Sequence, residues 1–136
     1  MENGYQDTSI SDIVNQVGVA HGLFYYYFDS KEELLDAIIE HLVRESRHRL
    51  EAIVHGDGTP LEKFHRFIQQ MFVLKKDRPY LIGYMLQERN RLFYHKWMQR
   101  ALEEITPLFT EIVEEGVAAG CFDTQYPHET VEFIFN

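Results

Sequence analysis

The sequence predicts an all-α fold, and two kinds of observation support this. Apolar residues recur three and four positions apart along almost the whole chain, which is the spacing of one helix face. Glycine, proline and small hydroxyl residues stand where these periodic stretches begin and end. The chain has 136 residues, of which 45% are hydrophobic. It can therefore bury a core, and we expect one globular domain, or one domain with a small appendage.

Two short helices are expected near the start of the chain. The first covers residues 9–17, where isoleucine and valine repeat at helical spacing. Thr8 or Ser9 can cap its N-terminus, and Gly18 ends it because glycine readily adopts the left-handed conformation of a helix end. The second short helix runs over residues 20–28 and contains five consecutive aromatic side chains.

A long helix is expected to follow. Ser30 with Glu33 three residues later is a capping-box pattern, and leucine and isoleucine then recur to about Val54. The stretch HGDGTP, residues 55–60, interrupts the pattern with two glycines and a proline placed to begin the next helix. We expect that next helix over residues 61–76.

Proline marks the remaining elements. Pro79 opens a short apolar segment, YLIGYMLQE, and an aromatic-rich helix is expected from about Asn90 to Ala119. Pro107 should kink or split that helix, because it removes one backbone hydrogen bond. Pro127 begins a last helix in the segment PHETVEFIFN.

Both ends of the chain interrupt a pattern. The last helix stops without a cap, so we expect Val131, Ile134 and Phe135 to form an exposed apolar face. The opening residues ENGY look like the exit of a helix. The sequence thus predicts that the chain lacks pieces at both ends.

The overall charge argues against general coating of nucleic acid. There are 13 Lys and Arg against 22 Asp and Glu, a formal net charge of −9. Phosphate binding is driven by cationic side chains, so the composition leaves only a localised contact with nucleic acid possible. The single cysteine, Cys121, excludes an internal disulfide and fits a reducing cytoplasm. We find no long apolar run, so no membrane segment is expected.

Two short helices joined by a glycine turn have the layout of a helix-turn-helix unit, whose second helix can lie in the DNA major groove. The stretch TSISDIVNQVGVAHGLFYYYFDSKEELLDAI, residues 8–38, resembles the DNA-binding domain of the TetR (tetracycline-repressor) family of bacterial transcriptional regulators. The matching positions occur without a gap. They are Thr8, Ser9, Gly18, Val19, Gly22, Tyr25, Tyr27, Phe28, Ser30, Lys31, Glu32 and a leucine pair. In the remaining two-thirds of the chain only the family's helical layout carries over.

The resemblance implies a TetR-like protein with two domains. Residues 1–48 would form the helix-turn-helix head, most of its first helix missing, together with the start of a linking helix. Residues 49–136 would form an incomplete helical bundle that binds an effector and dimerises. A homodimer would bind a palindromic operator in double-stranded DNA, and a small molecule would release it by favouring the released geometry. No cofactor and no enzymatic activity are implied.

The resemblance also assigns the DNA contacts. Thr8 and Ser9 would cap the bracing helix and touch phosphate, while Ser11 lies where base-reading side chains are common. The recognition helix would present five residues, and Lys31 would meet a phosphate beside the free N–H groups of the long helix. The five residues are His21, Gly22, Leu23, Tyr26 and Tyr27.

One feature departs from this expectation. Residues 8–28 contain no Lys or Arg, and residues 1–49 carry four basic groups against nine acidic ones. Most cationic contacts would therefore have to come from outside this segment, and we expect the chain alone to bind DNA weakly.

The larger domain carries more aromatic and methionine side chains than a small bundle needs. An ordinary core explains each residue singly, but as a set they favour a site for a hydrophobic or aromatic effector. The effector could be cationic if Glu88 lies inside. The candidates are Phe64, Phe67, Met71, Tyr84, Met85, Glu88, Phe93 and Trp97.

Two other classes of protein remain open from the residues alone. Glu45 with His48, and Glu62 with His65, are Glu-x-x-His pairs of the kind that hold two metal ions in helical oxidases. Their charged surroundings instead indicate solvated helix faces, so we expect no metal site. A purely interacting helical module is the third alternative, and it predicts dimerisation without DNA or ligand.

Overall fold

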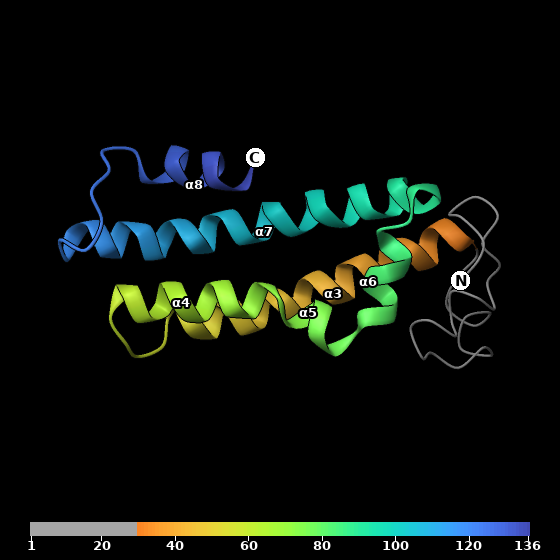
Figure 1. The fold of residues 1–136 in the computed structure, drawn as a ribbon, viewed down its shortest axis with the longest axis horizontal. Helices are drawn as coiled ribbons and strands as arrows, with labels where there is room; N and C mark the ends of the chain where they lie inside the picture. The colour runs from red at the N-terminus through yellow and green to blue at the C-terminus, as the bar shows by residue number, and fades with distance from the viewer. Residues whose placement is uncertain (1–29) are drawn as a thin grey trace. The chain divides into compact units, whose positions relative to one another are not determined.

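The computed structural model describes residues 30–136, and their regular elements are helices (Figure 1). The all-α prediction is therefore confirmed for this part of the chain. The helices expected over residues 9–17 and 20–28 lie outside it. The elements are α3 (Lys31–Val54), α4 (Pro60–Met71), α5 (Val73–Asp77), α6 (Pro79–Met85), the 3₁₀ helix η1 (Glu88–Asn90), α7 (Arg91–Ala118) and α8 (Pro127–Phe135).

The chain divides into two compact units. The first comprises Met1–Leu42 and Leu74–Met98, and the second comprises Val43–Val73 and Gln99–Asn136. Helices α3 and α7 therefore each contribute residues to both units. This division does not coincide with the boundary expected after residue 48, which stays a prediction about functional domains.

The break expected at residues 55–60 is confirmed, and a capping box starts the helix after it. The hydroxyl of Thr59 accepts the Glu62 N–H at 3.2 Å, and the Glu62 carboxylate accepts the Thr59 N–H at 2.9 Å. Pro60 occupies the first helical turn, where its missing N–H costs nothing. Local chemistry alone therefore accounts for the start of α4.

The helix expected over residues 61–76 is not continuous, which corrects the sequence prediction. Helix α4 ends at Met71, and the Phe72 N–H donates to the Gln69 carbonyl at 3.2 Å, a bond that tightens the last turn. Helix α5 then begins at Val73. No glycine or proline marks this break, so it cannot be predicted from turn chemistry.

Helix α7 runs through Pro107 without being split. The proline lacks an N–H, so the carbonyl of Glu103 loses its partner in the helix. Directly after the proline, Leu108, Phe109 and Ile112 are buried. We infer that burying these side chains outweighs the lost hydrogen bond, because each fully buried large apolar side chain contributes about 1.5–3 kcal/mol.

The C-terminus of α7 closes with a Schellman motif, next to the end expected at about Ala119. The Cys121 N–H donates to the Gly116 carbonyl at 2.8 Å, and the Gly120 N–H donates to the Val117 carbonyl at 3.1 Å. Gly120 has φ of 78°, the left-handed conformation that this motif requires.

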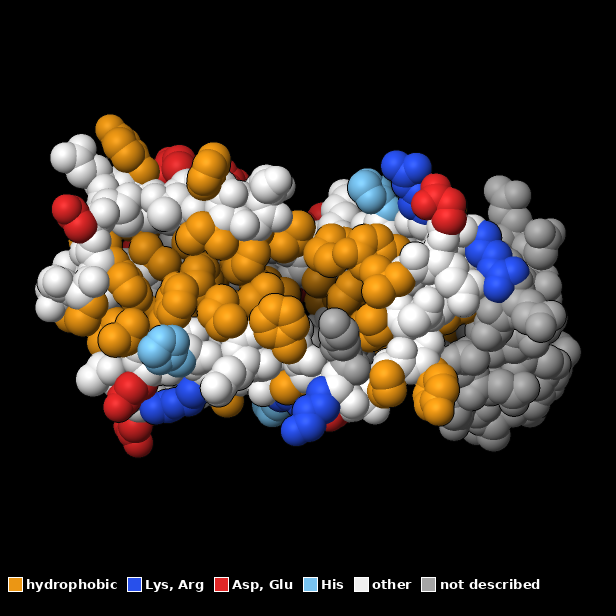
Figure 2. Space-filling model, in the orientation of Figure 1, with side chains coloured by type: hydrophobic (Ala, Val, Ile, Leu, Met, Phe, Trp, Pro, Cys, Tyr) orange, Lys and Arg blue, Asp and Glu red, His pale blue; other side chains and the backbone are white. Residues whose placement is uncertain are grey.

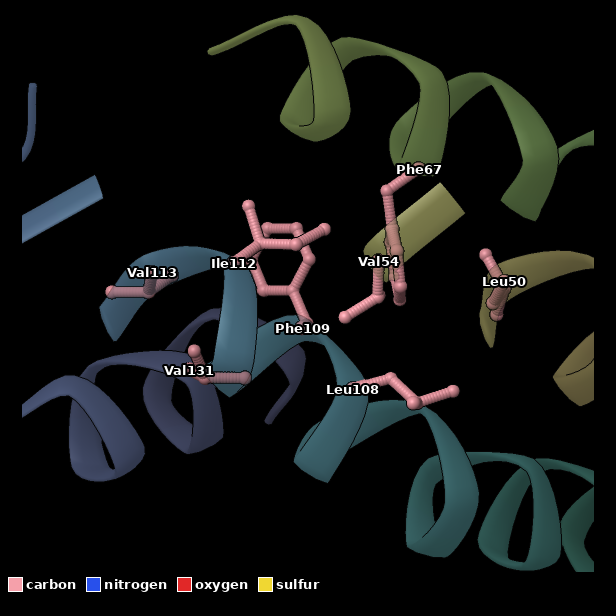
Figure 3. Close-up of a cluster of buried hydrophobic side chains, with 8 residues drawn as sticks. All are labelled: Leu50, Val54, Phe67, Leu108, Phe109, Ile112, Val113 and Val131. Carbon is pink, nitrogen blue, oxygen red and sulfur yellow. The ribbon is translucent and has the colours of Figure 1, made fainter. Parts of the chain in front are cut away.

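The core of the second unit joins four helices (Figure 3). Phe109 lies at its centre, with its ring centroid 5.0 Å from that of Phe67 and 5.3 Å from that of Phe64. The buried members come from α3, α4, α7 and α8. They are Leu50, Val54, Phe67, Leu108, Phe109, Ile112, Val113 and Val131.

Helix α8 packs against the core through Val131 and Phe135, which corrects the expectation that these two side chains are exposed, while the expected exposure of Ile134 is confirmed. Val131 is fully buried, and the half-buried ring of Phe135 lies 5.4 Å from that of Phe109. Figure 1 shows α8 alongside the C-terminal half of α7. The apolar side chains of α8 that do remain exposed are Phe133 and Ile134.

A buried lysine connects three helices of the second unit. The Lys63 Nζ donates to the Val54 carbonyl at the end of α3, at 3.0 Å. It also donates to both carboxylate oxygens of Glu115 on α7, each at 3.1 Å. The ammonium group thus satisfies a terminal carbonyl of α3 and has its own charge balanced, which makes its burial tolerable.

The first unit has its own buried apolar side chains, supplied by α3, α6 and α7. The Tyr84 and Phe93 rings lie 6.1 Å apart, and the Lys96 ammonium lies 3.7 Å from the Asp36 carboxylate. Within residues 30–136, no helix combines the length and the apolarity needed to cross a membrane. The buried side chains are Leu34, Leu35, Ile38, Ile39, Leu42, Leu81, Tyr84, Met85 and Phe93.

Candidate functional site

The N-terminus of α3 is the described element nearest in sequence to the predicted DNA contacts. The Ser30 hydroxyl accepts the Glu33 N–H at 3.1 Å, and the Ser30 carbonyl accepts the Leu34 N–H at 3.1 Å. The serine half of the predicted capping box is therefore confirmed. This cap sets where the chain leaves the preceding segment and becomes α3.

Replacing Ser30 with alanine should lower the free energy of unfolding by about 1 kcal/mol, because an N-cap hydroxyl satisfies a backbone donor that otherwise lacks a partner. Guanidinium denaturation followed by circular dichroism measures this change. Ser46 lies inside α3, so Ser46→Ala is the matched control and should be neutral or slightly stabilising. Equal effects of the two substitutions would contradict the capping role.

Most of the predicted DNA contacts lie outside the residues that the structure describes. These are Thr8, Ser9, Ser11, His21, Gly22, Leu23, Tyr26 and Tyr27. Lys31 begins α3, but the position of its side chain also lies outside the description. The next two residues, Glu32 and Glu33, are exposed acids that suit the helix dipole. All of these DNA contacts stay predictions.

The predicted effector residues fall into two groups, one in each unit. Phe64, Phe67 and Met71 lie on α4 in the second unit. The others, Tyr84, Met85, Glu88, Phe93 and Trp97, lie in the first unit. Each group is therefore a separate candidate binding surface.

In the second unit, the α4 group contributes to the core. Phe67 is fully buried, and Phe64 and Met71 are half-buried residues packed against the same cluster. The Phe64 ring also lies 5.8 Å from that of Phe122. Figure 2 shows hydrophobic side chains reaching the surface of this unit between α4 and α8. An effector contact by Phe64 or Met71 stays a prediction.

In the first unit, a polar side chain lies among the predicted aromatic residues. Asn90 is fully buried, and its Nδ2 donates to the Tyr84 carbonyl at 2.6 Å. Its backbone N–H donates to the Gln87 carbonyl at 2.8 Å. The Asn90 Oδ1 has no hydrogen-bond partner among the described residues. Tyr84, Met85 and Phe93 are buried, and we call them, together with the free Asn90 acceptor, the candidate first-unit site.

Sequence reasoning missed Asn90 because it stands in the run QERNR, which looks like a charged surface. The one available signal was its position directly before a helix, where asparagine is a common cap. In the structure the Asn90 side chain is buried and its Nδ2 donates to the Tyr84 carbonyl. Only the three-dimensional structure shows that Asn90 is buried with one acceptor unpaired.

Glu88 does not lie inside an apolar pocket. Its side chain is 89% exposed, and its carboxylate lies 3.6 Å from the Arg91 guanidinium. The expectation of a cationic effector depended on a buried Glu88, and this position removes its support. An exposed ion pair of this kind contributes little to stability.

The Glu-x-x-His pairs are not brought together as a metal site. The Glu62 carboxylate is engaged by the Thr59 N–H and by Arg66, and the side chains of His48 and His65 are exposed. Across residues 30–136, no group of three or more His, Cys, Asp or Glu side chains could hold a metal ion.

Comparison with known families gives one match. Residues 1–38 match the family of bacterial regulatory proteins known as the tetR family. The matched segment contains all the predicted DNA contacts and ends inside α3, shortly after the Ser30 cap.

Curated relatives and a solved structure agree with this match. An HTH-type transcriptional regulator of Bacillus subtilis, YvdT, is 45% identical over 56 residues, which cover 41% of this chain and 29% of that protein. The fatty acid metabolism regulator protein of B. subtilis is 29% identical over 121 residues, which cover 88% and 62%. The matches to curated relatives thus span less than two thirds of those proteins.

The crystal structure of a TetR/AcrR-family transcriptional regulator from Thermobifida fusca is similar over most of its length. It is 30% identical with a TM-score of 0.60, and the alignment covers 98% of this chain and 72% of that one. The fold of this chain is therefore similar to that of a TetR/AcrR-family regulator.

Proposed function

This chain belongs to the TetR family of bacterial regulatory proteins, and we propose that it acts in a ligand-responsive, DNA-binding transcriptional repressor. The observation that carries the proposal is the match over residues 1–38, which includes every predicted DNA contact. TetR-family members are regulators rather than enzymes, so the metal-dependent oxidase is set aside.

The acidic composition determines which groups of such a chain would contact DNA and how strongly the chain would bind. With no Lys or Arg in residues 8–28, hydroxyl groups, ring edges and backbone amides would make the contacts there. Few counterions would be released, so affinity should be low and should fall gently with salt.

The effector in this proposal is a hydrophobic or aromatic small molecule. The buried side chains of Tyr84, Met85 and Phe93 support this chemistry, and the exposed position of Glu88 argues against a required cation. The effector must bind the DNA-free geometry better than the DNA-bound one, because only differential affinity shifts an equilibrium.

A homodimer on a palindromic operator is the assembly that we propose, working in the cytoplasm where bacterial DNA lies. Two-fold symmetry of the protein would match two-fold symmetry of the operator. Helix α8 retains exposed Phe133 and Ile134, apolar side chains that a partner could cover.

Selection from a random duplex library at about 50 mM salt tests this function, since weak electrostatic binding is strongest at low salt. We expect palindromic sequences to be enriched. Tyr26→Phe should then weaken binding to the selected duplex about tenfold, the effect of losing one hydroxyl contact to a charged group.

Tyr80→Phe supplies the matched control, because Tyr80 is an 85% exposed tyrosine on α6 and lies outside the matched segment. It should leave the affinity unchanged. No enrichment above the starting library, or equal losses for the two tyrosines, would contradict the proposal.

A further inference from the structure

Asn90 has an oriented side chain with one unused acceptor. A carbonyl oxygen can only accept a hydrogen bond, so the short contact with the Tyr84 carbonyl requires the Nδ2 group to face it. This contact therefore distinguishes the nitrogen atom of the side-chain amide from its oxygen atom. The Oδ1 atom points away from that bond and has no partner within residues 30–136.

The other buried polar side chains in the described part of the chain show how unusual this is. Lys63 makes three hydrogen bonds, and the Thr110 hydroxyl donates to the Thr106 carbonyl at 2.7 Å. An unpaired buried acceptor costs about 1–3 kcal/mol, so in native proteins it calls for a specific explanation.

A trapped water explains the acceptor poorly. A buried water typically requires two to four polar partners. Among the described side chains, Oδ1 is the single buried nitrogen or oxygen atom left without a partner, so no second such atom is available to hold a water beside it. The hydrogen bond to the Tyr84 carbonyl places Asn90 next to Tyr84, whose buried ring lies 6.1 Å from that of buried Phe93. One acceptor beside apolar and aromatic surface is instead the pattern of a small-molecule site, in which one polar group fixes orientation.

We propose that Asn90 Oδ1 is the polar anchor of the effector site and selects effectors that carry a hydrogen-bond donor on an aromatic body. A hydroxyl or ring N–H group satisfies the acceptor. An ether of the same shape leaves it unpaired, and a carboxylate meets it as a second acceptor. This proposal rests on the proposed ligand-responsive function and adds the chemical class of the ligand.

Phenol and anisole are the first probe pair, because anisole keeps the ring and the oxygen but has no donor. Indole and 1-methylindole are the second pair, with the donor on nitrogen. Isothermal titration calorimetry on the 136-residue chain measures each dissociation constant. We expect the donor-bearing member of each pair to bind about tenfold more tightly, the effect of one buried hydrogen bond.

Asn90→Leu removes the acceptor at similar volume, and it should bring both affinity ratios close to one. Gln87→Leu is the matched control. It deletes a nearby amide that is half-buried and accepts from the Arg89 Nε at 2.8 Å, so its ratios should equal those of the unaltered chain.

The ratios in the unaltered chain do not depend on whether Asn90→Leu folds. Equal binding within both pairs overturns the proposal, and so does the absence of binding by all four probes. Ratios that persist in a folded Asn90→Leu variant also overturn it. The selection of palindromic DNA needs no effector. It therefore distinguishes an error in the proposed role of Asn90 from an error in the proposed DNA-binding function.

Discussion

Replacing Phe109 with alanine is expected to lower the free energy of unfolding by about 3–5 kcal/mol, the range for deleting a buried ring. Phe109 is fully buried, and its ring lies 5.0 Å from that of Phe67, 5.3 Å from that of Phe64 and 5.4 Å from that of Phe135. These partners come from α4 and α8. Loss of the central ring therefore leaves a cavity that no single helix can close.

Guanidinium denaturation followed by far-ultraviolet circular dichroism measures the effect. Phe133→Ala is the matched control, because Phe133 belongs to α8 but is 85% exposed. It should change stability by less than about 0.5 kcal/mol. A Phe109→Ala loss as small as that of the control would show that the ring is not central to the core.

Gly116→Ala should destabilise the protein by about 1–3 kcal/mol, although alanine favours helix formation over glycine. A Cβ at this position would overlap the Phe122 ring and lie 3.0 Å from its Cγ. The ring would have to leave its place near Phe64. Steric overlap should therefore outweigh the gain in helix propensity.

Gly83→Ala should have the opposite sign. Gly83 lies in α6, and a Cβ there would meet nothing within 4 Å. Only helix propensity acts, so we expect stabilisation of up to about 1 kcal/mol. Thermal unfolding of the two variants beside the unaltered chain gives the comparison. A stabilising Gly116→Ala would contradict the close packing of Phe122 on α7.

The starts of the helices could be predicted because their chemistry is local. Ser30 accepts from a donor three residues away, and Pro60, Pro79 and Pro127 each stand in a first helical turn. The Thr59–Glu62 capping box follows the same three-residue rule and could have been found by it.

The break between α4 and α5 could not be predicted in this way. Apolar spacing continues across Phe72, and no residue that favours turns stands there. The split that Pro107 could have caused does not occur, since this proline lies inside a continuous α7, while a kink there stays a prediction. In both places the surrounding packing, rather than the local sequence, decides whether the helix continues.

The candidate site shows the same limit. Aromatic composition indicated an apolar effector, but it could not separate the α4 side chains from those of the first unit. From the sequence, Glu88 could have been placed inside the effector site, and Asn90 was not recognised as buried. The two residues are only two positions apart. Which of two neighbouring polar residues is buried depends on the direction each faces in the fold.

From its sequence alone, this protein is identified as a helical member of the TetR family, because periodicity, caps and the residues of the matched segment are local properties. The tertiary structure decided that Lys63, Asn90 and Val131 are buried. Lys63 meets Glu115 across 52 positions of the chain. Whether a side chain is buried depends on residues that lie far from it in the sequence. Neither charge nor hydropathy along the sequence specifies which of these side chains will meet.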